Sequence, residues 1–235
     1  MDKIFTKNIE HESAVKHVTG KAIYTDDISE PKNLLHAVIG YSNCSKGVIK
    51  KIDYKDVLSS EGVVDIITEK DIEGINDVGP IFKGDKIFTS KNIEYYGQPI
   101  FAVIAKTNNL AKKAALKVKI DLKISKPIVS IEEALKKKSF VLKPKYLTRG
   151  NIKDGFKKSD NILKGKLYSG GQDHFYLEGQ IAMTIPQEDN NFLVYSSTQH
   201  PSETQQIIGK VLKQNYNSIH AVSYTHLRAH ETVVH

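Results

Sequence analysis

The chain of 235 residues contains a single cysteine, Cys44, so it can form no internal disulfide. One thiol also excludes an iron–sulfur cluster or a cysteine-rich zinc site built from this chain's own residues. The absence of disulfides is typical of a reducing compartment. We therefore expect a cytoplasmic protein.

Long apolar runs are missing as well. No stretch approaches the ~20 apolar residues of a membrane helix, and the N-terminal MDKIFTKNIEHES lacks the apolar core of a signal peptide. The motifs G-x-G-x-x-G and G-x-S-x-G are absent. GNIKDGFK (150–157) has glycines five apart, but Phe156 stands where a phosphate-binding loop needs lysine. The sequence therefore predicts no membrane span and supports neither a dinucleotide loop nor a hydrolase.

Charge of neither sign dominates strongly. Lys+Arg 34 against Asp+Glu 27 gives a net charge of +7, with 40% apolar and 26% charged residues, which is typical of a folded protein. The lysines are scattered, and the densest run, Lys136 to Lys138, ends an expected helix, where cations interact favourably with the helix dipole. We expect no nucleic-acid partner.

Hydrophobic periodicity in the first half predicts a mixture of strands and helices. The helix LAKKAALKV has one apolar face, with Asn109 as its expected N-cap. Residues 69–97, rich in Gly, Asp and Lys, are expected to form a long connection. Strands are expected at 34–40, 47–54, 63–67, 98–107 and 119–124.

The second half continues the pattern after a boundary that we place at 138–150. It contains an expected strand at 192–198 and a helix after Pro201. The sequence predicts two helix-starting capping boxes, Ser130 with Glu133 and Ser202 with Gln205. The fold class expected from the whole pattern is α+β.

The stretch GGQDHFYLEGQ (170–180) places four different hydrogen-bonding side chains behind two glycines. Gly170 and Gly171 allow a sharp turn or a close approach of the backbone to another group. His174 and Glu178 could form a metal pair, but residues four apart in a strand lie about 13 Å apart, too far to share one ion. A polar strand bonded to neighbouring loops is at least as compatible with the spacing.

The stretch SSTQHP (196–201) lies between an expected strand and an expected helix. Ligand-binding side chains cluster at such junctions in proteins that mix strands and helices. Gln199 offers both an N–H donor and a carbonyl acceptor. The start of a helix, with Pro201 setting the turn, explains the same pattern, and both interpretations stay open.

Together these stretches resemble the molybdenum-cofactor (large) subunit of the xanthine oxidase/aldehyde oxidase family of molybdenum hydroxylases. GGQDHFYLE followed by SSTQ has the order and spacing of the family pattern, and GNIKDGFKKSDNILKGKLYS leads into it continuously. GKAIYTDD (20–27) is similar to the beginning of the family's α/β hammerhead domain. EYYGQPIFAVIAKTNNLAKKAALKVKIDL (94–122) is similar to that domain's GQP strand and following helix. The resemblance covers roughly residues 10 to 222.

The resemblance implies an α/β hammerhead domain followed by the truncated start of a molybdopterin-binding domain. It divides the chain into an N-terminal extended segment (1–20), the hammerhead (21–125), a linker (126–150), the start of the molybdopterin-binding domain (151–222) and a tail outside the family pattern (223–235).

The tail SYTHLRAHETVVH contains no glycine, although the family continues there into an Arg-bearing strand and a glycine-rich loop with a substrate-facing glutamate. We interpret the tail as an artefact of a lost reading frame. His226, His230 and Glu231 could be drawn as a helical metal site, but we do not expect one. The family's general-base glutamate has no counterpart in this sequence, so we assign no catalytic residue.

By resemblance, Gln199 places its side-chain amide next to an oxo ligand of molybdenum, and Gly170 and Gly171 belong to the cofactor-binding part. An N–H group aimed at such an oxygen stabilises charge that develops there. The implied reaction is the hydroxylation of a purine by a xanthine dehydrogenase. Electrons then pass to iron–sulfur clusters, FAD and NAD on partner subunits, which makes the enzyme a hetero-oligomer.

Two alternatives remain beside this reading. An aldehyde oxidase or another N-heterocycle dehydrogenase of the same family would share these motifs. A non-catalytic binding or assembly module built on the hammerhead would belong to a different class. For the chain by itself we expect neither turnover nor stable cofactor binding.

Overall fold

The computed structural model describes residues 13–173 and 179–223. The chain divides into a larger unit, Met1–Ser125 with Phe175–His235, and a smaller unit, Lys126–His174. His174 and Glu178 lie outside the described residues, as do the histidines of the tail. Among the described helices, none has the length and apolar character needed to cross a membrane.

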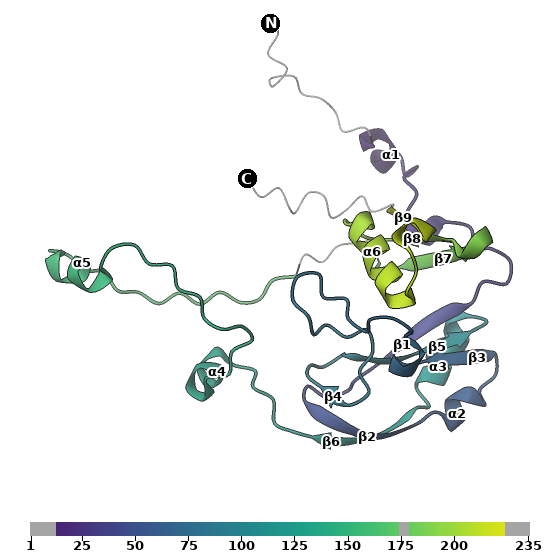
Figure 1. Cartoon of the computed structure of the whole chain (residues 1–235), viewed down its shortest axis with the longest axis horizontal. Helices are drawn as coiled ribbons and strands as arrows, with labels where there is room; N and C mark the ends of the chain where they lie inside the picture. The colour runs from purple at the N-terminus through teal and green to yellow at the C-terminus, as the bar shows by residue number, and fades with distance from the viewer. Residues whose placement is uncertain (1–12, 174–178, 224–235) are drawn as a thin grey trace, which may run out of the picture. The chain divides into compact units, whose positions relative to one another are not determined.

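The central strand of the first sheet is β5 (Pro99–Ala105). It pairs antiparallel with β1 (His36–Tyr41) on one edge and with β3 (Val63–Ile67) on the other (Figure 1). Its side chains from Ile100 to Val103 are buried, which explains why its sequence is almost entirely apolar. The strands expected at 34–40, 63–67 and 98–107 are confirmed with small shifts at their ends.

Helix α3 (Asn108–Ala115) packs on this sheet against β1 and β5 through the buried side chains of Ala111 and Ala114. The prediction of Asn109 as its N-cap is wrong. Thr107 has an extended backbone and its hydroxyl accepts a hydrogen bond from the Leu110 N–H at 3.3 Å. Thr107, two residues after the end of β5, is therefore the N-cap of α3.

A second sheet completes the hammerhead. β2 (Gly47–Asp53) lies between β4 (Asn92–Ile93) and β6 (Lys119–Ile124), and both pairings are antiparallel. Buried side chains of both sheets and of the short α2 (Lys55–Leu58) form one apolar core, which includes Cys44. The strand β4 lies within residues 69–97, the stretch expected to form a connection. Its two residues are too few to give a periodic signal.

The third sheet is formed by β7 (Ala182–Pro186), β8 (Phe192–Ser196) and β9 (Ile219–Ser223). β8 pairs antiparallel with β7 and parallel with β9. Helix α6 (Pro201–Leu212) makes the crossover that a parallel pair requires and packs against β9. The strand expected at 192–198 and the helix after Pro201 are confirmed.

The capping box of Ser202 with Gln205 is wrong. The helix begins at Pro201, whose missing N–H is no loss at a first helical position. Ser202 therefore already lies inside the helix. The Gln205 side-chain N–H instead donates to the Ile219 carbonyl at 2.8 Å, so this residue ties α6 to β9.

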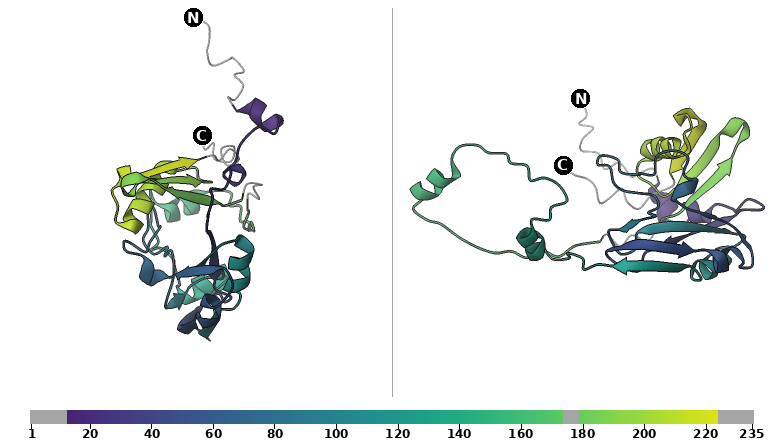
Figure 2. Two further views of the ribbon diagram at one scale, coloured as in Figure 1. Left: turned by 90° about the vertical axis from the view of Figure 1, so that its right-hand side faces the viewer. Right: turned by 60° about the horizontal axis from the view of Figure 1, so that its bottom comes forward.

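The smaller unit consists of two short helices, α4 (Ile131–Lys137) and α5 (Ile152–Lys158), joined by irregular chain (Figures 1 and 2). The Ser130 hydroxyl accepts from the Glu133 N–H at 3.2 Å, which confirms Ser130 as the N-cap. The reciprocal half of the expected capping box is not formed, and the Glu133 carboxylate pairs with Lys137 at 2.7 Å instead. None of its described residues is buried, and Val141, Leu147 and Leu163 are fully exposed.

The net positive charge of the chain comes from this smaller unit. Between residues 126 and 173 lie 12 of the 34 Lys+Arg and 5 of the 27 Asp+Glu, which leaves 22 of each sign elsewhere. The whole net charge of +7 therefore belongs to this stretch. A segment that is basic, unburied and poor in regular structure is open to proteases.

Limited trypsin digestion of the chain should cut first between residues 126 and 173, because the lysines there lie on exposed irregular backbone. The measurement is the mass of the earliest fragments. Lysines in β2 and β6, such as Lys51 and Lys123, serve as internal controls because they lie in paired strands. First cuts within those strands would contradict the described division of the chain.

Tyr54 packs edge-on against Phe101 at the centre of the hammerhead, with ring centroids 5.3 Å apart and planes at 71°. Burial raises the pKa of the Tyr54 hydroxyl to about 12, and the Asp71 carboxylate adds a smaller contribution in the same direction. The folded state thus holds the Tyr54 proton more tightly than the unfolded state does, for which the pKa is about 10.

The contribution of Tyr54 to stability should be complete below about pH 10 and be lost as the pH rises from about 10 to about 12. Because the side chain is half-buried, we expect a loss on the order of 1 kcal/mol. The free energy of unfolding, measured in urea across this pH range, should fall more steeply for the natural chain than for Tyr54→Phe. Parallel declines of the two proteins would show that Tyr54 titrates as in water.

Candidate functional site

The junction between β8 and α6 carries the candidate residue Gln199, and its first anchor is Ser197. The Ser197 N–H donates to the Ile181 carbonyl at 3.0 Å. In return, the Ile181 N–H donates to the Ser197 hydroxyl at 3.0 Å. This reciprocal pair fastens the end of β8 to the residue before β7.

The second anchor is Thr198. Its hydroxyl accepts from the His200 N–H at 3.1 Å, which closes a tight turn around Gln199. Its carbonyl accepts a short hydrogen bond from the Ser223 hydroxyl at the end of β9. The Thr204 hydroxyl in the first turn of α6 donates to the His200 carbonyl at 3.1 Å. The backbone on both sides of Gln199 is therefore held by named bonds.

Gln199 itself lies in a bend between strand and helix, and its side chain is exposed. A primary amide here offers two N–H donors and one carbonyl acceptor from a fixed backbone. The interpretation of SSTQHP as the start of a helix is confirmed. The ligand role of Gln199 stays a prediction.

The candidate glycines Gly170 and Gly171 lie in exposed irregular chain of the smaller unit. A Cβ atom built on either glycine would meet nothing within 4 Å, so no group of the described chain makes a close approach to them. The polar strand expected here is not formed at residues 170–173, since no partner strand supplies the backbone bonds that a strand needs. The cofactor role of both glycines stays a prediction.

The chemistry of Gln199 suits a molybdopterin cofactor, whose oxygens accept hydrogen bonds from an amide. The enclosure such a group needs is missing, because Gln199, Gly170 and Gly171 are all exposed. Within the described ranges, no three His, Cys, Asp or Glu side chains gather to hold a metal ion. These residues could therefore hold part of such a group, but they do not by themselves form a closed cofactor site.

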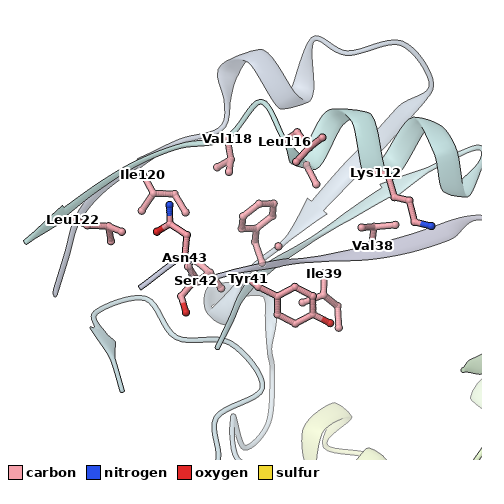
Figure 3. A pocket seen from close by; sticks show the side chains of 14 residues that line it. Val38, Ile39, Tyr41, Ser42, Asn43, Lys112, Leu116, Val118, Ile120 and Leu122 are labelled. Atoms are coloured by element: carbon pink, nitrogen blue, oxygen red, sulfur yellow. The ribbon is translucent and has the colours of Figure 1, made fainter. Parts of the chain in front are cut away.

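A hollow also lies elsewhere, within the hammerhead. It has a volume of about 660 Å³ and is bounded by β1, β5, α3 and β6 (Figure 3). Its walls are mainly aliphatic and aromatic, with Ser42, Asn43 and Lys112 as polar members. It contains none of the three candidate residues. Its size suits a ligand, but its lining residues include no His, Cys, Asp or Glu that could act as a base for the Ser42 hydroxyl, so we give it no catalytic role.

A smaller hollow of about 370 Å³ lies between residues 25–37 and β7. His36 Nε2 lies 3.9 Å from a carboxylate oxygen of Glu30 at its wall, and the buried Thr25 hydroxyl has no hydrogen-bond partner among the described residues. One histidine–carboxylate contact and one hydroxyl do not make a catalytic arrangement. This hollow therefore does not compete with the Gln199 junction as the functional site.

Two regions of the chain match known protein families. Residues 19–126 match the family described as "Aldehyde oxidase and xanthine dehydrogenase, a/b hammerhead domain". Residues 134–225, which include Gly170, Gly171 and Gln199, match the "Molybdopterin cofactor-binding domain". The chain belongs to the aldehyde oxidase and xanthine dehydrogenase family of molybdenum hydroxylases.

Curated relatives carry both names. The chain is 37% identical over 214 residues to a xanthine dehydrogenase of Dictyostelium discoideum, covering 91% of this chain and 16% of that protein. It is 38% identical over 214 residues to aldehyde oxidase 1 of Bos taurus, covering 90% of this chain and 16% of that protein. The chain thus spans about a sixth of the length of these relatives, and the activity of a whole relative does not pass to it directly.

Solved structures confirm the α+β fold of a hammerhead followed by the start of a molybdopterin-binding domain. An aldehyde oxidoreductase from Desulfovibrio gigas matches with a TM-score of 0.78 at 25% identity, over 90% of this chain and 26% of that one. Quinoline 2-oxidoreductase from Pseudomonas putida 86 matches with a TM-score of 0.76 at 18% identity, over 90% and 29%. The second likeness shows the fold alone.

Replacing Ser197 by Ala should lower the free energy of unfolding by about 1 kcal/mol, because the Ile181 N–H loses its acceptor. Gln199→Ala should change it by less than about 0.5 kcal/mol, because the side chain is exposed. Urea unfolding of both variants measures the difference. A loss for Gln199→Ala as large as that for Ser197→Ala would mean that Gln199 is structural.

Proposed function

We propose that the chain is part of the molybdenum-binding subunit of a xanthine dehydrogenase, which hydroxylates hypoxanthine or xanthine at a molybdopterin centre. The observation that carries the proposal is the amide of Gln199. It extends from a turn pinned on both sides, within the region that matches the molybdopterin cofactor-binding domain. A side chain that contacts a bound cofactor must be exposed and must extend from a fixed backbone.

The part proposed for Gln199 is that of a positioned N–H donor. When bound, molybdopterin supplies the metal that accepts the electrons of the oxidation. A donor that is already oriented stabilises charge on a nearby oxygen without reorganisation during the reaction. The bonds made by Ser197 and Thr198 supply that orientation.

Aldehyde or N-heterocycle oxidation is the second candidate function. It is supported by the bovine aldehyde oxidase, to which this chain is 38% identical. The identity to the xanthine dehydrogenase of Dictyostelium discoideum is nearly the same, at 37%. Identity therefore does not separate the two substrate classes, and the choice of purine remains our proposal on the motif resemblance. A non-catalytic assembly role for the hammerhead is a possible outcome of the test below.

The proposal includes partner subunits. With Cys44 as its only thiol, the chain cannot ligate an iron–sulfur cluster. We place the 2Fe-2S clusters, FAD and NAD on separate polypeptides of a cytoplasmic hetero-oligomer. The exposed apolar side chains of residues 126–173 support a need for further protein to cover them.

The test uses a protein extended to the length of the relatives and co-expressed with its partners. We expect about one molybdenum per subunit, and oxidation of xanthine. Gln199→Ala should lower kcat by roughly a hundredfold or more while the molybdenum content stays near normal. Gln206→Ala, an exposed glutamine of α6, is the matched control and should have no effect.

The outcomes separate the candidates. Turnover of aldehydes without turnover of purines would favour the second candidate function. Absence of molybdenum from a protein that assembles with its partners would remove the enzyme and leave the assembly role. Equal activity of Gln199→Ala and Gln206→Ala would remove the role proposed for Gln199.

A further inference from the structure

The C-terminal end of α6 is tied to the hammerhead by backbone hydrogen bonds. The last carbonyls of a helix lack partners within it and must be satisfied from outside. Lys213 adopts a left-handed conformation with φ 52°, and the Gln214 N–H that follows donates to the Gly209 carbonyl at 2.9 Å. This local cap satisfies the Gly209 carbonyl. The carbonyls of the last three helical residues, 210–212, have no partner within the helix.

Two of the remaining carbonyls are satisfied by a loop distant in the sequence. The Gly74 N–H donates to the Val211 carbonyl at 2.8 Å, and the Ile75 N–H donates to the Lys210 carbonyl at 3.1 Å. We call this contact the Gly74 joint. It connects the region that matches the hammerhead family to the region that matches the cofactor-binding family.

Only glycine fits at the joint. A Cβ atom at position 74 would lie 1.9 Å from the Lys210 carbonyl oxygen and 2.5 Å from that of Val211. These are backbone atoms of a helix end, which cannot move aside as a flexible side chain would. Any other residue at 74 must therefore push α6 and the loop apart and break both bonds.

The loop that carries Gly74 is itself held by hydrogen bonds to the hammerhead. The Asn76 side chain donates to the Phe88 carbonyl at 2.8 Å and accepts from the Phe88 N–H at 3.1 Å. Phe88 is buried, and the Thr89 N–H donates to the carbonyl of Pro99 at the start of β5. Hydrogen bonds joined by short stretches of backbone therefore connect the central strand of the hammerhead to the end of α6.

We propose that Gly74 is a positioning residue for Gln199. The joint fixes the C-terminal end of α6, and the N-terminal end of the same helix follows the turn that carries Gln199. A helix of 12 residues is about 18 Å long and transmits this constraint as a rigid body. The inference rests on the role proposed for Gln199, and it assigns the hammerhead a direct part in orienting that residue.

The test compares Gly74→Ala with Gly165→Ala in the full chain. At Gly165 a Cβ meets nothing within 4 Å, so this variant controls for the added methyl group. The first readout is amide hydrogen exchange of residues 201–212, with β5 as the internal reference. We expect exchange in α6 to rise roughly tenfold or more in Gly74→Ala, through loss of two backbone bonds, and not in Gly165→Ala.

The second readout reports on position 199 itself. The chain contains no tryptophan, so Gln199→Trp provides a single fluorescent reporter. In this background Gly74→Ala should lower the fluorescence anisotropy, and Gly165→Ala should leave it unchanged. An increase in α6 exchange with unchanged anisotropy would make Gly74 merely structural and would overturn the proposal, as would equal values for the two alanine variants.

If Gly74→Ala loses protection in β5 as well, Asn76→Ala decides the question. It removes the two loop bonds to Phe88 without adding an atom at the joint. Loosening of α6 and of position 199 with β5 intact supports the proposal, and an unaffected α6 overturns it. None of these readouts needs molybdenum or turnover, so failure of the proposed function and failure of the Gly74 joint are distinguishable.

Discussion

The pairing of β5 with β1 and β3 is the constraint on which the larger unit depends. Phe101 of β5 is fully buried, and its ring lies over Gly40 of β1, where a Cβ would come within 2.2 Å of a ring atom. Tyr54 packs on the same ring, and α3 covers the sheet. Gly40 thus leaves room for the buried phenylalanine ring against β1. The loop that reaches α6 is anchored at Pro99, the first residue of β5.

Regular elements of the hammerhead could be predicted because their signals are local. Within QPIFAVIAKT, the run PIFAVIA is continuously apolar and too short for a buried helix, so its sequence indicates a buried strand. The caps were less predictable. Thr107 and Asn109 both follow β5 closely, and the backbone conformation that selects Thr107 depends on where the strand ends. At α6, Pro201 begins the helix one residue before Ser202 and leaves Gln205 to bond β9.

The candidate site was predictable in part. Gln199 is identified through resemblance to a family motif, since an exposed glutamine two residues before a proline has no distinctive physical pattern. The bonds that hold its turn come from Ile181 and Ser223, which lie far along the chain and carry no local signal. Gly74 was equally hidden, as one of several glycines in a stretch expected to be a connection. Glycine is required at positions 170 and 171 only if another part of the protein packs closely against them.

These features give the two regions of the chain different roles. The hammerhead has its own buried core, while the residues of the cofactor-binding region present a fixed turn and an exposed amide. The most direct test is a crystal structure of a molybdopterin-loaded protein extended to the relatives' length. The predicted result is a Gln199 side-chain nitrogen about 3 Å from an oxygen of the cofactor, with the turn at 197–200 as described here. A Gln199 side chain that faces solvent beside an occupied site would contradict it.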